Sequence, residues 1–465
     1  MRFLKIYTLP VLTILVGGLF LMPACKKSSG SDPVDEELNL VRSLPNDVVY
    51  DWNELFLEIE RYAAGYRPGP APRAIAYMGL ADYEACITGM PEFNSIASLY
   101  GGLNIPPVES DKQYHWPAVI NAARAYLMPR FFINATPQQM QDMTGLQAFY
   151  DQKSKQEVGE EVWTRSSEYG KTVAGAIWEY SKTDAVGHNH FLDPFQGYNW
   201  QDHFSKDGDW KPTFPGPGKP MGGVWGGARI FAISEGDKIC RKPLTYSASQ
   251  TSELYSQALE VYAQNTPSLS YDAEWIGEFW SDDLVNLTFS PGPRWLAIGN
   301  QVLVQEESNL ETAVFMTVKV GFALNDASVA CWKSKYHYNV ERPQTYINRL
   351  MDPSWKPALF NPLTGEAGVT PSFPAYPSGH STMGAAGAEV LGDIFGYAYA
   401  MTDRCHENRN EFEGKPRTFG SFYEMAEENA WSRVPLGVHF RMDCDEGVRF
   451  GTVIGRKVND LPWKG

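Results

Sequence analysis

Apolar residues recur every three or four positions in several parts of the chain, which is the spacing of amphipathic helices. The pattern is clear over residues 52–62, 162–180 and 252–262, whereas the alternating pattern of strands is scarce. Residues 314–332 are apolar or small almost throughout and predict a buried helix. We therefore expect an all-α fold of helical bundles, with an N-terminal helical region and a C-terminal bundle.

The helical pattern breaks between His188 and Pro243, where the chain is rich in Gly, Pro and Trp. This composition predicts a long irregular connection, and we place a domain boundary there. The predicted domains are an N-terminal helical region at 39–250 and a C-terminal helical domain at 251–465. His188 and His190 have no third ligand nearby in the sequence, so we interpret them as part of a polar loop and not as a metal site.

The start of the chain has the features of an export signal, with Arg2 and Lys5 before an apolar stretch at 6–22. Cys25 follows a small residue and precedes a polar segment, which resembles a bacterial lipoprotein. We expect a signal peptide at 1–25, a lipidated Cys25 and a polar tether at 26–38. The protein would then be exported and lipid-anchored to the bacterial cell envelope, at the periplasmic or outer-membrane face. An uncleaved membrane anchor is the alternative, because about 17 apolar residues is the short limit for spanning.

Charge changes how the basic residues are interpreted. The chain has 40 Lys and Arg against 55 Asp and Glu, a net charge of −15, which opposes binding to nucleic acid or to an anionic lipid surface. Membrane contact is therefore expected only through the N-terminal anchor, and basic residues that converge locally are informative. Apart from Cys25 there are five cysteines without paired short spacing, so we expect buried free thiols, with one disulfide still allowed.

Two cations stand near the end of the predicted buried helix. Lys335 is followed after six residues by Arg342, and Pro343 forces the chain out of helix at that point. A lysine and an arginine at a helix end can also simply complement the helix dipole. The pair becomes informative only together with other segments.

A second segment, at 373–380, runs from a proline-rich approach into a stretch of small residues. Ser378 can cap a helix that starts at Gly379, and the glycine exposes backbone N–H groups where an oxyanion would be held. His380 lies on the first turn and can donate or accept a proton. A plain helix cap explains the serine and the glycine equally well, but it does not require the histidine.

A third segment contains Arg433 and, beyond Pro435 and Gly437, His439 and Asp443. The last two fall one turn apart, so we expect them on the same helix face, with Asp443 orienting the imidazole. A surface His–Asp pair is the alternative. The three segments together supply three cations, a helix start and two histidines, a set that suits an anion carrying several charges on three or more oxygens.

These three segments, in this order, closely resemble the vanadium-dependent haloperoxidases and the wider type 2 phosphatidic acid phosphatase superfamily, over roughly residues 270–450. The resemblance implies that His439 binds vanadium or forms a phosphohistidine and that His380 is the general acid–base. It implies that the oxygens of vanadate or phosphate are held by Lys335, Arg342, Ser378, Gly379 and Arg433.

The resemblance extends to residues around the site. Trp332 and Phe373 match positions that flank the halide in the fungal chloroperoxidases, and bromoperoxidases carry histidine at the Phe373 position. Asp283 matches the aspartate that pairs with the arginine of the third segment, with Asp282 as the alternative. Glu341 departs from the family, where chloroperoxidases have tryptophan; an acid there either lowers oxyanion affinity or faces outward.

Two activities follow from this resemblance. The first is a vanadium-dependent haloperoxidase that oxidises halide with hydrogen peroxide, and Trp332 and Phe373 favour it. The second is an acid phosphatase that hydrolyses a phosphomonoester through His439, with phosphate in the place of vanadate. A protein that only binds phosphate or vanadate would not need His380 or the His439–Asp443 pair.

Overall fold

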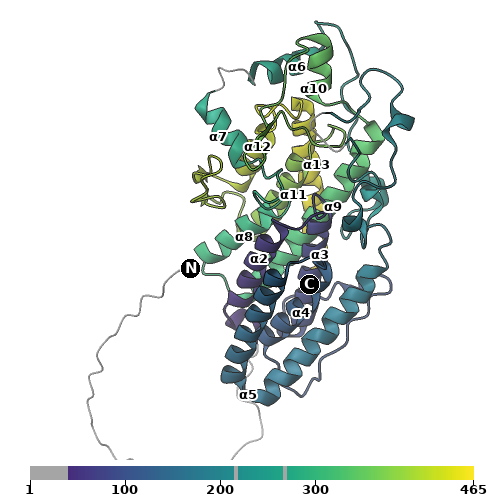
Figure 1. The fold of residues 1–465 in the computed structure, drawn as a ribbon. Coiled ribbons are helices and arrows are strands. Elements are labelled where there is room, and N and C mark those ends of the chain that lie inside the picture. The colour runs from purple at the N-terminus through teal and green to yellow at the C-terminus, as the bar shows by residue number, and fades with distance from the viewer. Residues whose placement is uncertain (1–39, 214–217, 265–269) are drawn as a thin grey trace, which may run out of the picture. The chain divides into compact units, whose positions relative to one another are not determined.

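Helices make up almost all of the regular structure in the computed structural model, which describes residues 40–213, 218–264 and 270–465. This confirms the predicted all-α fold, and the segments predicted to be helical all lie in or overlap helices (Figure 1). In these residues the α-helices are α2 (Asp47–Glu60), α3 (Pro70–Cys86), α4 (Trp116–Phe131), α5 (Pro137–Lys182), α6 (Glu253–Gln264), α7 (Tyr271–Phe279), α8 (Arg294–Gln305), α9 (Leu310–Tyr338), α10 (Pro343–Leu350), α11 (Gly379–Phe395), α12 (Phe422–Trp431) and α13 (Arg441–Asn459).

Strands are few and short. β1 (Phe360–Asn361) pairs antiparallel with β2 (Glu366–Ala367), and β3 (Met401–Asp403) pairs antiparallel with β4 (Arg417–Phe419). Each pair is a small hairpin-like element at the end of a loop, so neither contributes a sheet to the core.

Helix α9 is the centre of the core. It is long and apolar enough to cross a membrane by length and composition, but 94% of its most apolar window is buried inside the protein. Helix α3 crosses it closely, because a Cβ at Gly79 would lie 2.8 Å from Val318 Cα and one at Gly321 would lie 2.7 Å from Ala76 Cα. Glycine at both positions lets the two backbones touch, so α3 of the N-terminal region packs directly on α9.

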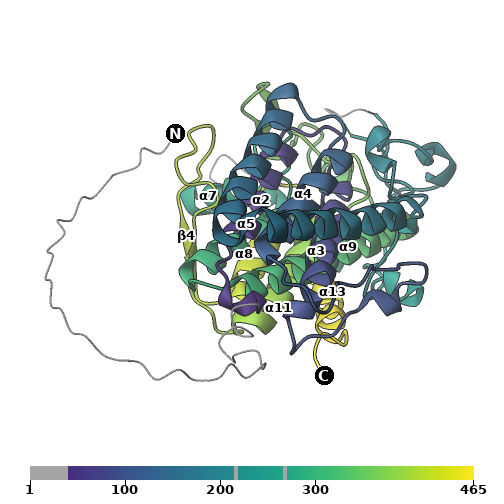
Figure 2. The ribbon, with the colours of Figure 1, turned by 90° about the horizontal axis from the view of Figure 1, so that it is seen from below.

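The remaining helices pack in two groups around α3 and α9. Helices α4 and α5 lie along each other and against α3, as Figure 2 shows from below. Helices α11, α12 and α13 pack together on the other part of α9. A Cβ at Gly451 of α13 would lie 2.1 Å from Thr382 O of α11, so these two helices approach to backbone contact. That approach brings the start of α11 close to the start of α13.

The predicted irregular connection is present between α5 and α6. Among its described residues, the regular structure consists of short 3-10 helices, at His190–Leu192, Trp200–His203, Trp225–Gly227 and Glu235–Lys238. It covers α9, because Asp326 of α9 accepts hydrogen bonds from the N–H groups of Phe231, Ala232 and Ile233. The residues that the structure describes fall in one compact unit, so the division at residue 250 stays a prediction.

The cysteines and His190 lie inside the described fold, whereas the predicted export signal does not. The five cysteines at 86, 240, 331, 405 and 444 are free thiols, as expected. His190 is buried against the ring of Trp225, 5.0 Å away, and no group of three metal-ligating side chains occurs in the part of the chain that the structure describes. The predicted signal peptide, lipidated Cys25 and tether lie outside the described residues.

Candidate active site

A cavity of about 150 Å³ lies where the end of α9 and the start of α11 meet two loops. It takes residues from both halves of the chain. The lining consists of Arg67, Pro68, Met221, Asp283, Leu284, Val285, Pro291, Trp332, Leu359, Val369, Pro371, Ser372, Phe373, Gly379, His380, Met383, Arg433 and His439.

Lys335 and Arg342 are both fully buried beside this cavity. Lys335 Nζ donates to the carbonyls of Pro374 and Ala375, at 2.9 and 2.8 Å. Arg342 Nε donates to Phe373 O at 2.9 Å, whereas its Nη2 is buried and has no hydrogen-bond partner among the described residues. Burial lowers the pKa of Lys335 to about 7 and that of Arg342 to about 10. An anion beside them would favour the charged forms of both groups.

The start of α11 is built as the sequence predicts. Ser378 is the N-cap, and its hydroxyl accepts a hydrogen bond from Ser381 N at 3.3 Å. Gly379 and His380 are the first helical residues, whose N–H groups have no acceptor within a helix. A Cβ at Gly379 would lie 3.2 Å from the ring of Trp332, so glycine keeps this approach open. The helix start can therefore hold an oxyanion.

His439 and Asp443 form the predicted contact, with Nδ1–H donating to Asp443 Oδ2 at 2.9 Å. The prediction that both lie on one helix face is wrong, because α13 begins at Arg441 and His439 precedes it. The physical reason is that the carboxylate of Asp443 also accepts the N–H of Phe440, at 3.1 Å, and so caps the first turn. One carboxylate thus starts the helix and orients the histidine.

The second ring nitrogen of His439 faces the cations. Its Nε2 accepts a hydrogen bond from Arg342 Nη1 at 3.1 Å. Burial and the charges of Arg342 and Lys335 lower the pKa of His439 well below its usual value. The imidazole is therefore neutral at pH 7, and the lone pair of Nε2, which here accepts from Arg342, is the one that would bind a metal or attack phosphorus once Arg342 turns to the ligand.

The loop after α7 supplies the contacts of Arg433 and His380. Arg433 Nη2 donates to Asp283 Oδ2 at 2.6 Å, so Asp283 and not Asp282 is its partner. Arg433 Nε is buried without a partner among the described residues. His380 Nε2 lies 2.8 Å from Ser281 O; since a carbonyl only accepts, Nε2 carries the proton. Burial and the charge of Arg433 lower the pKa of His380 to about 4.

Trp332 and Phe373 form an aromatic wall of the cavity. Their ring centroids lie 4.9 Å apart. The Phe373 ring also faces both cations, with Lys335 Nζ 5.1 Å and Arg342 Cζ 5.0 Å from its centroid. Trp332 Nε1 donates to Met221 O at 3.3 Å, which fixes the indole against the long connection.

The structure settles the position of Glu341 and adds residues that the sequence did not indicate. The carboxylate of Glu341 accepts two hydrogen bonds from Arg349, at 2.6 and 2.9 Å. Its charge is therefore paired with Arg349 and not with the cations of the site. Met221 and Arg67 line the cavity from the connection and from the N-terminal region. Neither belongs to a local motif, so no signal in the sequence could have found them.

The donors of the site fit a tetrahedral oxyanion. Arg342 Nη2 and Arg433 Nε are buried without hydrogen-bond partners among the described residues. Buried unpaired donors cost about 1–3 kcal/mol each, more when charged, unless a ligand satisfies them. Together with the start of α11, they match the oxygens of vanadate or phosphate, and His439 Nε2 supplies the atom that would bind vanadium or attack phosphorus.

Comparisons with known proteins agree with this chemistry. The model of the VCPO second helical-bundle domain matches residues 315–462. The vanadium chloroperoxidase of Curvularia inaequalis is 28% identical over 217 residues, which span 36% of this chain and 36% of the chloroperoxidase. The alignment therefore covers little more than a third of that relative's length.

Solved structures resemble almost the whole chain. The first bacterial vanadium-dependent iodoperoxidase superposes with a TM-score of 0.78 and 26% identity, covering 91% of this chain and 98% of that one. A holo-type bacterial vanadium-dependent chloroperoxidase gives a TM-score of 0.60 at 14% identity, covering 85% and 94% of the two chains, and shows the shared fold alone.

The fold is thus helical, and its site places a histidine with a lowered pKa among the buried side chains of Lys335, Arg342 and Arg433. Residues 315–462 therefore match the VCPO second helical-bundle domain, and the chain as a whole resembles a bacterial vanadium-dependent iodoperoxidase.

Proposed function

We propose that the protein is a vanadium-dependent haloperoxidase that oxidises halide with hydrogen peroxide. The observation that carries the proposal is the aromatic wall of Trp332 and Phe373 directly beside the oxyanion donors. An anion with a thin hydration shell can lie against such a wall, whereas a hydrolase acting on a small polar ester would have no need of it. The likeness to an iodoperoxidase over 91% of the chain supports the proposal.

Vanadate is the proposed cofactor, with His439 Nε2 as the ligand of vanadium. Its oxygens would be held by Lys335, Arg342, Ser378, Gly379 and Arg433. Bound vanadate would supply a Lewis acid that activates hydrogen peroxide without changing its own redox state.

His380 handles the protons. Its Nε2–H is committed to Ser281 O, which leaves Nδ1 as the ring atom that can accept a proton from hydrogen peroxide and return it to the departing oxygen. The pKa near 4 in the structure keeps the imidazole neutral and ready to accept. A bound oxyanion raises this pKa, because negative charge nearby stabilises the imidazolium.

Acid phosphatase activity is the second candidate, because the same geometry serves it. A neutral His439, oriented by Asp443, can attack phosphorus in line while His380 protonates the leaving oxygen. Arg342 and Arg433 would hold the phosphoryl oxygens, and the aromatic wall suits an aryl or lipid leaving group.

A paired assay decides between the two activities. Purified protein lacking residues 1–25 is reconstituted with orthovanadate, and oxidation of iodide, bromide and chloride by hydrogen peroxide is compared with hydrolysis of an aryl phosphate. Halide oxidation that requires vanadate and is inhibited by phosphate is the expected result. Hydrolysis without vanadium, inhibited by vanadate and without halide oxidation, would instead make the protein a phosphatase.

We further propose that the protein is exported and anchored by a lipid on Cys25. The apolar segment at 6–22 followed by Ala24 and Cys25 supports this. Expression of the full chain in a bacterium with labelled palmitate should label the wild type and not Cys25→Ser, and the labelled protein should sediment with the membranes. Equal labelling of both would overturn the proposal.

A further inference from the structure

The loop between α7 and α8 touches the site at two points. The carbonyl of Ser281 accepts the Nε2–H of His380, and the carboxylate of Asp283 accepts from Arg433. Leu284 and Val285 line the cavity next to these contacts. The orientation of both the histidine and the arginine therefore depends on where this loop lies.

Asp282 stands between the two contact residues and faces the other way. Its backbone is left-handed, with φ of +40°. The carboxylate is buried and accepts a hydrogen bond from Arg294 Nη1 at 3.1 Å. Its other oxygen lies 2.8 Å from His406 Nε2, which also lies 2.6 Å from Arg294 Nη1. Burial raises the pKa of Asp282, but His406 and Arg294 outweigh it and lower the pKa to about 2.

The partners of Asp282 are themselves fixed. Arg294, at the start of α8, is 1% exposed and donates through Nη2 to Asp403 of β3 at 2.7 Å. From the N-terminal region, Arg67 donates to the backbone carbonyls of Asp282, at 3.1 Å, and of Thr288. The loop is thus held through charged groups on both sides.

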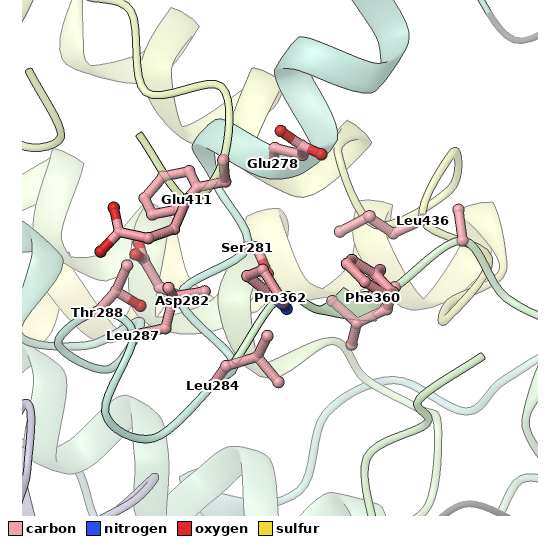
Figure 3. Close-up of a pocket in the computed structure, with 13 residues that line it drawn as sticks. Glu278, Ser281, Asp282, Leu284, Leu287, Thr288, Phe360, Pro362, Glu411 and Leu436 are labelled. Atoms are coloured by element: carbon pink, nitrogen blue, oxygen red, sulfur yellow. The ribbon is translucent and has the colours of Figure 1, made fainter. Parts of the chain in front are cut away.

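Packing alone does not hold the loop, because a second small cavity of about 50 Å³ lies behind it. Figure 3 shows this cavity bordered on one side by Asp282, Leu284 and Thr288 of the loop, and on the other by Glu278 and Leu436. A loop with space behind it can shift unless polar contacts fix it.

We propose that Asp282 is a positioning residue: anchored by Arg294 and His406, it fixes the Ser281 carbonyl on His380 and the Asp283 carboxylate on Arg433. The anchored loop keeps the proton of His380 on Nε2, and it holds the Arg433 side chain in one orientation. The effect on turnover rests on the haloperoxidase function proposed above, whereas the effect on the tautomer of His380 does not.

The test compares Asp282→Asn with Asp403→Asn in the otherwise intact protein. Asparagine tolerates left-handed backbone, so the first variant removes the charge without straining the chain. Asp403→Asn removes the charge of the other carboxylate that pairs with Arg294, which lies on β3 and not on the loop. Both variants should lower the Tm, but only Asp282→Asn should lower turnover, by about 10- to 100-fold as for other supporting contacts of ligated sites. Vanadate affinity should fall less than turnover, because Lys335, Arg342 and His439 lie on other segments and stay in place.

A second readout does not need activity. In protein with ¹⁵N-labelled histidine, with the His380 signals assigned from His380→Gln, the wild type and Asp403→Asn should show one tautomer protonated on Nε2. Asp282→Asn should show a mixture of tautomers. A single Nε2–H tautomer in Asp282→Asn, or equal losses of turnover in the two variants, would overturn the proposal. A wild type that oxidises no halide would refute the proposed function, and the tautomer comparison would still decide the role of Asp282.

Discussion

The two walls of the cavity are built in different ways. The first wall consists of Phe373 and His439, which line the cavity, with the buried cations Lys335 and Arg342 behind them: Lys335 Nζ lies 5.1 Å from the Phe373 ring, and Arg342 Nη1 lies 3.1 Å from His439 Nε2. On the other wall, the loop after α7 contributes a backbone carbonyl at Ser281 and the side chain of Asp283, and distant residues hold it in place. The first wall carries the chemistry, and the second sets the orientation in which the chemistry proceeds.

This difference determines what a sequence can reveal. A wall of charged side chains requires particular residue types at short spacing, so it leaves motifs. A backbone carbonyl can come from any residue, and its supports are tertiary contacts such as that of Arg67 with the loop. We therefore expect substitutions in the first wall to remove activity, and substitutions of the residues that hold the second wall to reduce it.

The largest effect is expected for His439→Ala in the first wall. Removing the vanadium ligand or nucleophile should lower either activity by about 10³-fold or more, as for other groups that form the covalent or ligated centre. Vanadate binding, measured by isothermal titration, should also be lost, while the folded protein persists because Asp443 still caps α13 through Phe440. Retained vanadate binding would remove His439 from the role of ligand.

His380→Ala should separate turnover from binding. Loss of the proton acceptor should lower turnover by about 10²- to 10⁴-fold. Vanadate should still bind, because Lys335, Arg342 and His439 remain in place. Steady-state halide oxidation and titration with vanadate on the same preparation check both parts, and turnover equal to the wild type would exclude the acid–base role.

Arg67→Met tests the second wall from the N-terminal region. It removes the donors to the carbonyls of Asp282 and Thr288, and hydrogen bonds from a charged group contribute about 1.5–3 kcal/mol each. We expect a lower Tm and a turnover reduced about tenfold, at the low end for supporting contacts. Arg61→Met is the matched control, because Arg61 is only partly buried and its side chain donates to the same loop at Asn286 O. Equal turnover in the two variants would place Arg67 outside the function of the site.

Sequence patterns accounted for the first wall and for the helical class, because both depend on local residue types. Ser378 caps α11 as predicted, and the buried helix at 314–332 lies within α9. The prediction failed where a tertiary or capping contact decided the backbone. His439 lies before α13 and not on it, because Asp443 uses its carboxylate to start the helix. Met221 reaches the cavity through a connection with no regular pattern, so only the fold could place it.

Glu341→Gln tests the residue next to Arg342 at which the sequence differs from the chloroperoxidases. The carboxylate pairs with Arg349, so oxyanion affinity should stay unchanged while the free energy of unfolding falls by about 1–3 kcal/mol. Urea unfolding and phosphate inhibition measure the two quantities. Tighter oxyanion binding in the variant would show that the charge of Glu341 reaches the site after all.

The smallest expected effect is on the pH dependence of stability, and it concerns two buried histidines, His190 and His380, whose pKa values are lowered to about the same value. Burial lowers the pKa of His190 to about 4, as burial and Arg433 do for His380. Between the unfolded value near 6.5 and pH 4, the unfolded chain binds protons that the folded chain does not, so stability falls as the pH falls through this window. His190→Gln should flatten the pH dependence of the unfolding free energy by up to about 1.4 kcal/mol per pH unit and leave turnover unchanged. His380→Gln should flatten it equally and abolish turnover. Urea unfolding at several pH values between 6.5 and 4.5 measures the slopes, and an unchanged slope in His190→Gln would mean that folding does not lower the pKa of His190.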